Sequence, residues 1–290
     1  MLIRNLDEND KDDIFKWRND KISRSMFFES SVVSKKSHDK WFFKSIKDKS
    51  KKIYIGEHKK KKIGVCRFEK RKYSSISEIS INMNPIFRGK GLASRFLKLS
   101  IDCYSKQNNT NLIAKIKKIN LKSQKLFKNV GFFLSKTKSL EMIYSLPKKQ
   151  LKFHKVTSKS GRDLYKLLKS RKHNISHKKM PSYQEHLNFI NNHPYLHWYL
   201  IEKGLPIGSF YIQEDNSIGM NIENPTPAII NEIYLFIKNS FKPRDAILSK
   251  VPPYFFINVA GNNKKMIKIL KKLEFFPIQI SFGFNQVKEF

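Results

Sequence analysis

Acidic residues are scarce in this chain, because its 290 residues include 24 Asp and Glu against 58 Lys and Arg. Cysteine is also rare: Cys66 falls in an expected strand and Cys103 in an expected helix, so no disulfide framework is expected. No apolar run approaches the ~20 residues of a membrane span, and the acidic segment 7–13 does not match a signal peptide. These absences predict a cytoplasmic protein with no membrane partner.

The positive charge has two interpretations. A formal net charge of +34 could serve nucleic-acid binding. The excess is mostly lysine spread over the whole chain, its densest run (residues 59–62) falls at an expected hairpin turn, and no aromatic and basic residues alternate as in RNA-binding motifs. We therefore expect the charge to attract small anionic substrates, with nucleic acid the less favoured partner.

One short motif stands between an expected strand (residues 78–83) and an expected helix that begins at Leu92. Residues 88–93 read Arg-Gly-Lys-Gly-Leu-Ala. The first turn of a helix has unpaired N–H groups and the positive end of the helix dipole, and glycines let an anion approach these groups closely. A Walker loop would need Ser or Thr after Lys90, and a dinucleotide-binding fingerprint would need a third glycine. The motif is therefore either a pyrophosphate-binding loop or a simple tight turn.

Periodicity gives the other elements of the first half. We expect helices over residues 7–24, 37–46 (with Ser37 as N-cap), 92–106 and 123–130. We expect strands at 52–56, 62–68, 78–83 and 112–116, and a closing hairpin within 132–144. This pattern predicts an α/β fold with a mixed sheet.

The order strand, Arg-x-x-Gly-x-Ala, helix resembles that of the GCN5-related N-acetyltransferase (GNAT) family over residues 1–146. The resemblance implies a catalytic domain at 1–148 that transfers an acetyl group from acetyl-CoA to a primary amine, without a metal. It also implies that an irregularity splays the strand before the loop from the next strand, so that backbone groups on it bind the pantetheine arm and polarise the thioester. The cofactor-binding residues implied are Ile81, Met83, Arg88, Gly89, Lys90, Gly91, Leu92, Ala93, Asn120 and Phe127.

The resemblance also suggests catalytic residues. Glu78, at the start of the strand, is the candidate general base, and His38 is placed near the amine. Phe127 stands where the family has a tyrosine general acid, and a phenylalanine has no proton to give. Water, Tyr144 or His38 would then protonate the thiolate.

The N-terminal signature is similar to acetyltransferases that modify nucleotide-linked 4-amino sugars for surface glycans (nonulosonic acids), and more loosely to ribosomal-protein acetyltransferases. It comprises residues 17–20, 24–27 and 38–42. The resemblance implies a substrate wall with Trp17 and Trp41 beside a base or sugar ring, and with Arg18 and Arg24 on phosphates. A sugar nucleotide is the first expectation, a protein N-terminal amine the second, and a non-catalytic acyl-CoA-binding module the third. The oligomeric state stays open.

The second half repeats the first at an offset of about 140 to 148 residues. Residues 199–210, 217–225 and 262–276 correspond to stretches around 54–65, 79–85 and 120–132. Prolines at 225 and 227 replace the glycine loop, and proline has no N–H for a phosphate. We therefore expect two tandem acyl-CoA N-acyltransferase-like domains, with a degenerate second one at 151–290.

Histidine pairs in the second half could in principle bind a metal. His173 and His177, and His193 and His197, have the i, i+4 spacing of one helix face. No glutamate follows the first histidine as in zinc peptidases, and His193 precedes a proline, which favours a loop. No metal site is expected.

Overall fold

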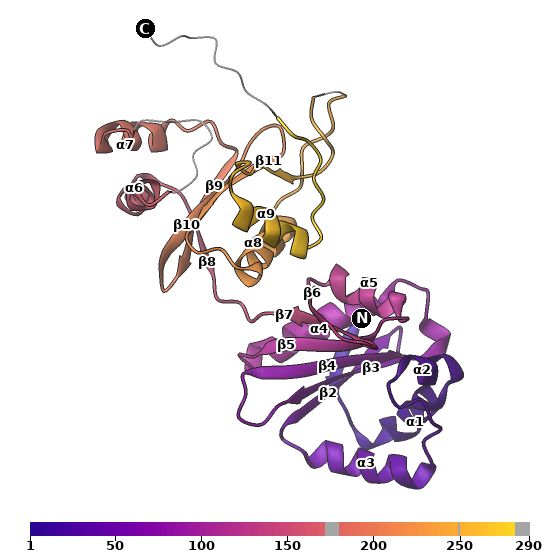
Figure 1. Ribbon diagram of the computed structural model, residues 1–290. Coiled ribbons are helices and arrows are strands. Elements are labelled where there is room, and N and C mark those ends of the chain that lie inside the picture. Colours follow the sequence, from indigo (N-terminus) through magenta and orange to yellow (C-terminus); the bar gives the residue numbers. More distant parts are fainter. Residues whose placement is uncertain (172–179, 249, 282–290) are drawn as a thin grey trace. The chain divides into compact units, whose positions relative to one another are not determined.

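The computed structural model describes residues 1–171, 180–248 and 250–281 of the chain (Figure 1). It divides into two compact units, Met1–Lys149 and Gln150–Phe290. The histidine pair at positions 173 and 177 lies outside the described residues.

The first unit is built on a seven-stranded mixed sheet with the order β1-β2-β3-β4-β5-β7-β6. Its strands are β1 (Leu2–Asn5), β2 (Lys51–His58), β3 (Lys61–Lys70), β4 (Ile76–Met83), β5 (Asn111–Lys117), β6 (Phe133–Thr137) and β7 (Glu141–Leu146). Neighbouring strands are antiparallel except β4 and β5, which run parallel. The expected mixed sheet is confirmed.

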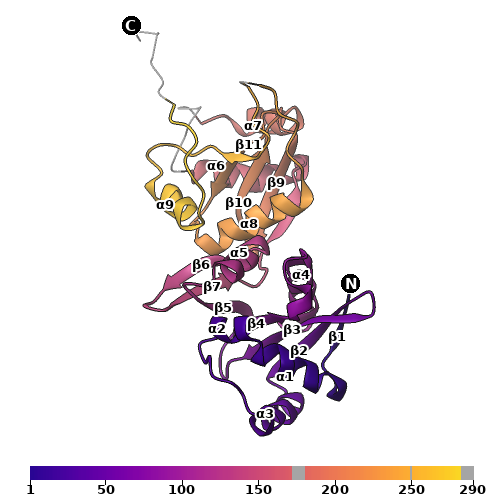
Figure 2. The ribbon, with the colours of Figure 1, turned by 90° about the vertical axis from the view of Figure 1, so that its right-hand side faces the viewer.

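Helices cover both faces of this sheet (Figure 2). They are η1 (Glu8–Asp10), α1 (Lys11–Asn19), α2 (Lys21–Met26), α3 (Lys35–Lys47), η2 (Pro85–Phe87), α4 (Leu92–Gln107) and α5 (Leu121–Asn129). Phe96 of α4 and Phe127 of α5 join the larger apolar core on one face. Trp17 of α1 and Phe42 of α3 pack against Ile55 on the other face.

Two helix boundaries differ from the sequence prediction. The helix expected over 7–24 is interrupted at Asp20, whose side chain accepts a hydrogen bond from the amide of Ser23 and so begins a new helix. The helix expected from Ser37 begins one turn earlier, because Ser34 is its N-cap and accepts the hydrogen bond from the Ser37 amide. Both errors arise because several residues nearby could cap a helix and the apolar spacing does not choose among them.

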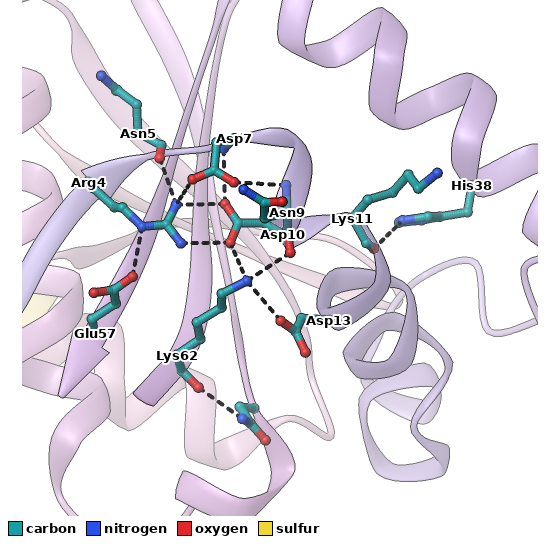
Figure 3. A network of polar contacts seen from close by, with 11 residues as sticks. Arg4, Asn5, Asp7, Asn9, Asp10, Lys11, Asp13, His38, Glu57 and Lys62 are labelled. Carbon is teal, nitrogen blue, oxygen red and sulfur yellow. Dashed lines mark hydrogen bonds and ion pairs between the residues drawn. The ribbon is translucent and has the colours of Figure 1, made fainter. Parts of the chain in front are cut away.

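A network of charged side chains ties the start of the first unit to its sheet (Figure 3). The carboxylate of Asp10, fully buried, accepts two hydrogen bonds of 2.7 Å from Arg4 and lies 2.8 Å from Nζ of Lys62. Arg4 also donates to Glu57 of β2 at 2.7 Å. The carbonyl of Lys62 accepts a hydrogen bond of 2.9 Å from Asn84, which follows β4. The network therefore links β1, β2 and β3 to the segment that leads into the glycine loop.

The second unit has a five-stranded sheet with the order β12-β11-β10-β9-β8. Its elements are β8 (Lys152–Lys155), η3 (Ser158–Ser160), α6 (Gly161–Lys169), α7 (Tyr183–Asn191), β9 (His197–Lys203), β10 (Leu205–Ile212), β11 (Ser217–Ile222), α8 (Pro227–Ser240), β12 (Phe256–Ile257) and α9 (Lys264–Lys272). Leu164 of α6 and Ile190 of α7 belong to one apolar cluster, and Ile233 of α8 and Ile269 of α9 belong to another.

The two units share one order of elements and strands. Each unit begins with a strand, a 3-10 turn and helices, which are followed by three antiparallel strands. A helix then leads to a strand that runs parallel to the last of these three strands, and a further helix follows. The first unit then adds the pair β6 and β7. The molecule is thus a mixed α/β fold with two sheets.

Candidate functional site

The parallel strands β4 and β5 separate over most of their length. They pair only from Ile76–Asn111 to Glu78–Ile113, although β4 continues to Met83 and β5 to Lys117. Beyond Glu78 the two strands therefore present unpaired edges to each other, and the sheet opens there.

Backbone groups of β4 point into this opening. The amide of Asn84 donates to the carbonyl of Ile63 at 2.9 Å, so this pair is hydrogen-bonded in the antiparallel ladder with β3. Hydrogen-bonded and non-hydrogen-bonded pairs alternate along such a ladder. The N–H and C=O groups of Ile81 and Met83 therefore point away from β3, toward β5. These are the two residues whose backbone the sequence prediction assigned to the pantetheine and thioester.

The glycine motif lies at the end of the same strand and opens helix α4. Gly89 (φ 74°) and Gly91 (φ 71°) adopt the left-handed conformation that glycine tolerates best. Gly91 is the N-cap of α4, and no side chain caps this helix end. The first amides of α4, from Leu92 and Ala93 onward, are therefore left for another acceptor, and Lys90 is exposed beside them.

Arg88 is engaged within the protein. Its guanidinium lies 2.7 Å from the Asp20 carboxylate, donates to Ser23 Oγ at 2.6 Å and to the carbonyl of Met83 at 3.3 Å. The sequence prediction placed Arg88 on the cofactor phosphates. The structure instead has Arg88 connect α2 to the end of β4, which leaves Lys90 as the exposed cation of the motif.

Glu78 lies at the point where β4 and β5 separate. Its carboxylate is 2.8 Å from Nζ of Lys115 on β5 and 3.4 Å from Arg71. About a third of the side chain is exposed. A half-exposed carboxylate beside an opening in the sheet is where a general base could receive a proton from a bound amine.

Two expected cofactor residues have clear structural partners. The side chain of Asn120 accepts a hydrogen bond from the amide of Ser123 and caps α5. Phe127 is buried and packs edge to face on Phe132 at 5.0 Å. Its contacts are those of a core residue, so the structure does not bring Phe127 to the opening.

None of the four tyrosines of the first unit, all of them described, lies half-buried at the opening. Tyr54, Tyr104 and Tyr144 are buried, and Tyr73 is fully exposed in a turn. The hydroxyl of Tyr144 donates to Gln124 at 3.3 Å inside the core. Tyr144 is therefore enclosed and cannot act as an open general acid.

His38 is also enclosed. Its side chain is buried among Phe15, Trp41 and Phe42, and Nε2 lies 3.0 Å from the carbonyl of Lys11. Burial lowers the pKa of His38 below its ordinary value, so the ring is neutral at pH 7. These contacts give His38 a structural role between α1 and α3, contrary to the catalytic role expected from the sequence.

The expected substrate wall is divided between core and surface. Trp17 is buried in the core, whereas Trp41 is half-buried with the Arg67 guanidinium 5.8 Å from its ring. Arg18 donates to the carbonyl of Glu29 at 2.7 Å, and Arg24 donates to that of Ser30 at 3.2 Å. Both arginines thus hold the segment between α2 and α3. Arg67 was not predicted as a site residue. Its sequence context offers one signal, a charged residue between the apolar residues Cys66 and Phe68 of β3.

Residues 1–133 match the family model of an acetyltransferase (GNAT) domain. No curated protein sequence matches the chain. Similar solved structures include the spermidine N-acetyltransferase from Vibrio cholerae in complex with CoA and spermine, at 19% identity over 50% of this chain and 92% of that chain, with a TM-score of 0.45. Another is the Campylobacter jejuni N-acetyltransferase PseH, at 20% identity over 51% and 98%, with a TM-score of 0.40. A third is RimL, a ribosomal L7/L12 alpha-N-protein acetyltransferase in complex with coenzyme A, at 17% identity over 49% and 91%, with a TM-score of 0.44.

The family match assigns the first unit a chemistry. The matched segment lies within the first unit and supports an acyltransferase activity for the protein. Among the residues described, no helix is both long and apolar enough to span a bilayer. Within the same residues, no group of three or more His, Cys, Asp or Glu side chains could hold a metal ion.

Proposed function

We propose that this acetyltransferase domain transfers an acetyl group from acetyl-CoA to the primary amine of a nucleotide-linked amino sugar. The observation that carries the proposal is the uncapped start of α4 behind Gly89 and Gly91, beside the opening between β4 and β5. The free amides of α4 would bind the pyrophosphate, with Lys90 adding a positive charge. The backbone of Ile81 and Met83 would hold the pantetheine and polarise the thioester carbonyl.

Glu78 would accept the proton of the acceptor ammonium, directly or through a water molecule. Lys115 and Arg71 flank its carboxylate and hold it in place at the opening. Since the tyrosines of this unit are enclosed or remote from the opening, water would return a proton to the departing thiolate.

The charge of the opening favours an anionic acceptor. Lys115 and Lys117 lie on one face of β5. Arg18 belongs to α1 and Arg24 to α2. A polyamine would be repelled by these cations, whereas a sugar nucleotide would be attracted. The alternative acceptor is the N-terminal amine of a protein, and an acceptor panel of UDP-amino sugars, peptides and spermidine distinguishes the three classes.

The direct test of the cofactor site is Gly91→Glu in the full chain. A carboxylate at this position repels the pyrophosphate, so we expect calorimetry to show loss of coenzyme A binding. The matched control is Gly204→Glu in the turn between β9 and β10, because Gly204 has nearly the same φ of 77° and also has open space around it. Unchanged affinity in Gly91→Glu would overturn the assignment of the loop.

We further propose that the second unit has the same fold without a cofactor site. The equivalent helix α8 begins at Pro227 and is capped by Thr226, whose side chain accepts a hydrogen bond from the amide of Ile229. One amide is therefore missing and another is already occupied at this helix end, in contrast to the start of α4.

A further inference from the structure

Arg67 lies on the face of the sheet that carries Glu78. Side chains alternate between the two faces of a strand, and Cys66 and Phe68 are buried on the face of α4. Arg67 therefore lies on the opposite face, directly across from Ser80, while Glu78 lies two residues further along β4. Such diagonal neighbours are separated by about 7 to 8 Å.

Three guanidinium groups gather at this face. Burial lowers the pKa of Arg18; the carboxylate of Glu29 opposes this, and the positive charges of Arg24 and Arg67 lower the pKa further. The Arg18 guanidinium lies 4.6 Å from the ring of Phe27 and Arg67 lies near Trp41. We call Arg18, Arg24 and Arg67 the arginine cluster. Cations so close together are stabilised when an anion lies between them.

One nitrogen of the cluster has no acceptor. Nη1 of Arg18 is buried, and among the residues that the structure describes none accepts a hydrogen bond from it. A buried charged donor without a partner is costly for the protein. Arg24 differs, because its Nε and Nη1 donate to the carbonyls of Asn19 and Ser30. Nε of Arg67 lies 3.6 Å from the Glu69 carboxylate, so the two Nη groups of Arg67 and Nη1 of Arg18 are the donors that the cluster has for a ligand.

We propose that Arg67 and Arg18 bind a phosphate group of the acceptor, with Trp41 beside it, and that Arg67 determines acceptor specificity. This inference rests on the proposed function. It requires an acceptor whose anionic group and amine lie far enough apart to reach Arg67 and Glu78 together. A nucleotide diphosphate joined to an amino sugar has both groups, whereas spermidine has no anion.

The test measures binding of UDP to the full chain saturated with coenzyme A, so that the cofactor loop is already occupied. We expect Arg67→Ala to weaken UDP binding roughly tenfold or more, since it removes charge-assisted hydrogen bonds. Arg67→Lys keeps the charge but loses the planar fork, so its affinity should be intermediate. The matched control is Lys70→Ala, which removes a positive charge from the other face of β3 and should leave UDP binding unchanged.

Two further probes separate the contribution of the arginines to binding from that of Trp41. Pyrophosphate tests the arginines without a base, and uridine tests Trp41 without a phosphate. Equal UDP affinity in Arg67→Ala and the parent protein would overturn the inference, as would equal losses in Arg67→Ala and Lys70→Ala. If coenzyme A itself fails to bind the parent protein, the proposed function fails. If coenzyme A binds and a UDP-amino sugar is acetylated while Arg67→Ala binds UDP as tightly as the parent protein, only the present inference fails. Acetylation of peptides or spermidine but not of UDP-amino sugars would overturn the proposed acceptor as well.

Discussion

Asp10 is a fully buried carboxylate whose partners come from β1 and β3. Burial raises the pKa of Asp10, but hydrogen bonds from Arg4, the Asp7 amide and Lys62 outweigh it and hold the pKa below its ordinary value. A lowered carboxyl pKa stabilises the folded state above the ordinary value of about 3.9, and this contribution is lost as pH falls through the lower folded pKa. Asp10 therefore stabilises the fold at neutral pH.

We expect Asp10→Asn to destabilise the first unit by about 2 kcal/mol at pH 7, because it removes the buried carboxylate shared by Arg4 and Lys62, which keep only more exposed carboxylates at its edge. Amide hydrogen exchange of β1, β2 and β3 measures the stability of the first unit separately from that of the second. The difference in stability between Asp10→Asn and the parent protein should shrink as pH falls below about 4. Asp12→Asn is the control, because Asp12 is exposed and pairs only with Lys35 at the surface. Equal effects of both variants would contradict this account.

Glu78 gives a second expectation at the level of a single side chain. Glu78→Gln keeps the size of the side chain but cannot accept the amine proton, so kcat should fall between about 100-fold and 10,000-fold. The KM for acetyl-CoA should change little. Glu8, exposed at the start of η1, provides the control Glu8→Gln. A kcat close to the parent value in Glu78→Gln would exclude this residue as the base.

At the level of elements, the sequence predicted well those helices and strands that depend on local residue pattern. The strand before the glycine loop, helix α4 and the hairpin of β2 and β3 follow from periodicity and from glycine, and their bounds differ from the prediction by at most a few residues. The opening between β4 and β5 was implied only by the family resemblance. No residue pattern in either strand marks where their pairing stops.

Long-range partners could not be predicted. Arg88 lies next to the glycines in sequence, yet its charge is matched by Asp20, 68 residues away. The burial of His38 depends on α1 packing against α3, and a histidine in an amphipathic helix has no signal that separates core from cleft. Arg67 joins Arg18 only because β3 lies beneath these helices. Contacts of this kind are set by tertiary packing, which local spacing does not encode.

At the level of the whole molecule, the two units differ most at one helix start. Because α4 alone, among the helices that the structure describes, has an uncapped N-terminus behind a glycine loop, we expect about one equivalent of coenzyme A to bind per chain. Calorimetry of the full chain measures this ratio. Two equivalents per chain, or a second binding event that survives Gly91→Glu, would contradict a second unit without a cofactor site.

The uncapped start of α4 also has a consequence for how the protein keeps its fold in a cell. Many helices carry their own cap, whereas no side chain caps this 16-residue helix, and under the proposed function a ligand takes that role. Any ligand that binds only the native state shifts the folding equilibrium, by about 2.7 kcal/mol at a free concentration of 100 times Kd. If coenzyme A binds there as proposed, its supply becomes part of the folding equilibrium of the first unit, and chains made when it is depleted are the more exposed to proteolysis.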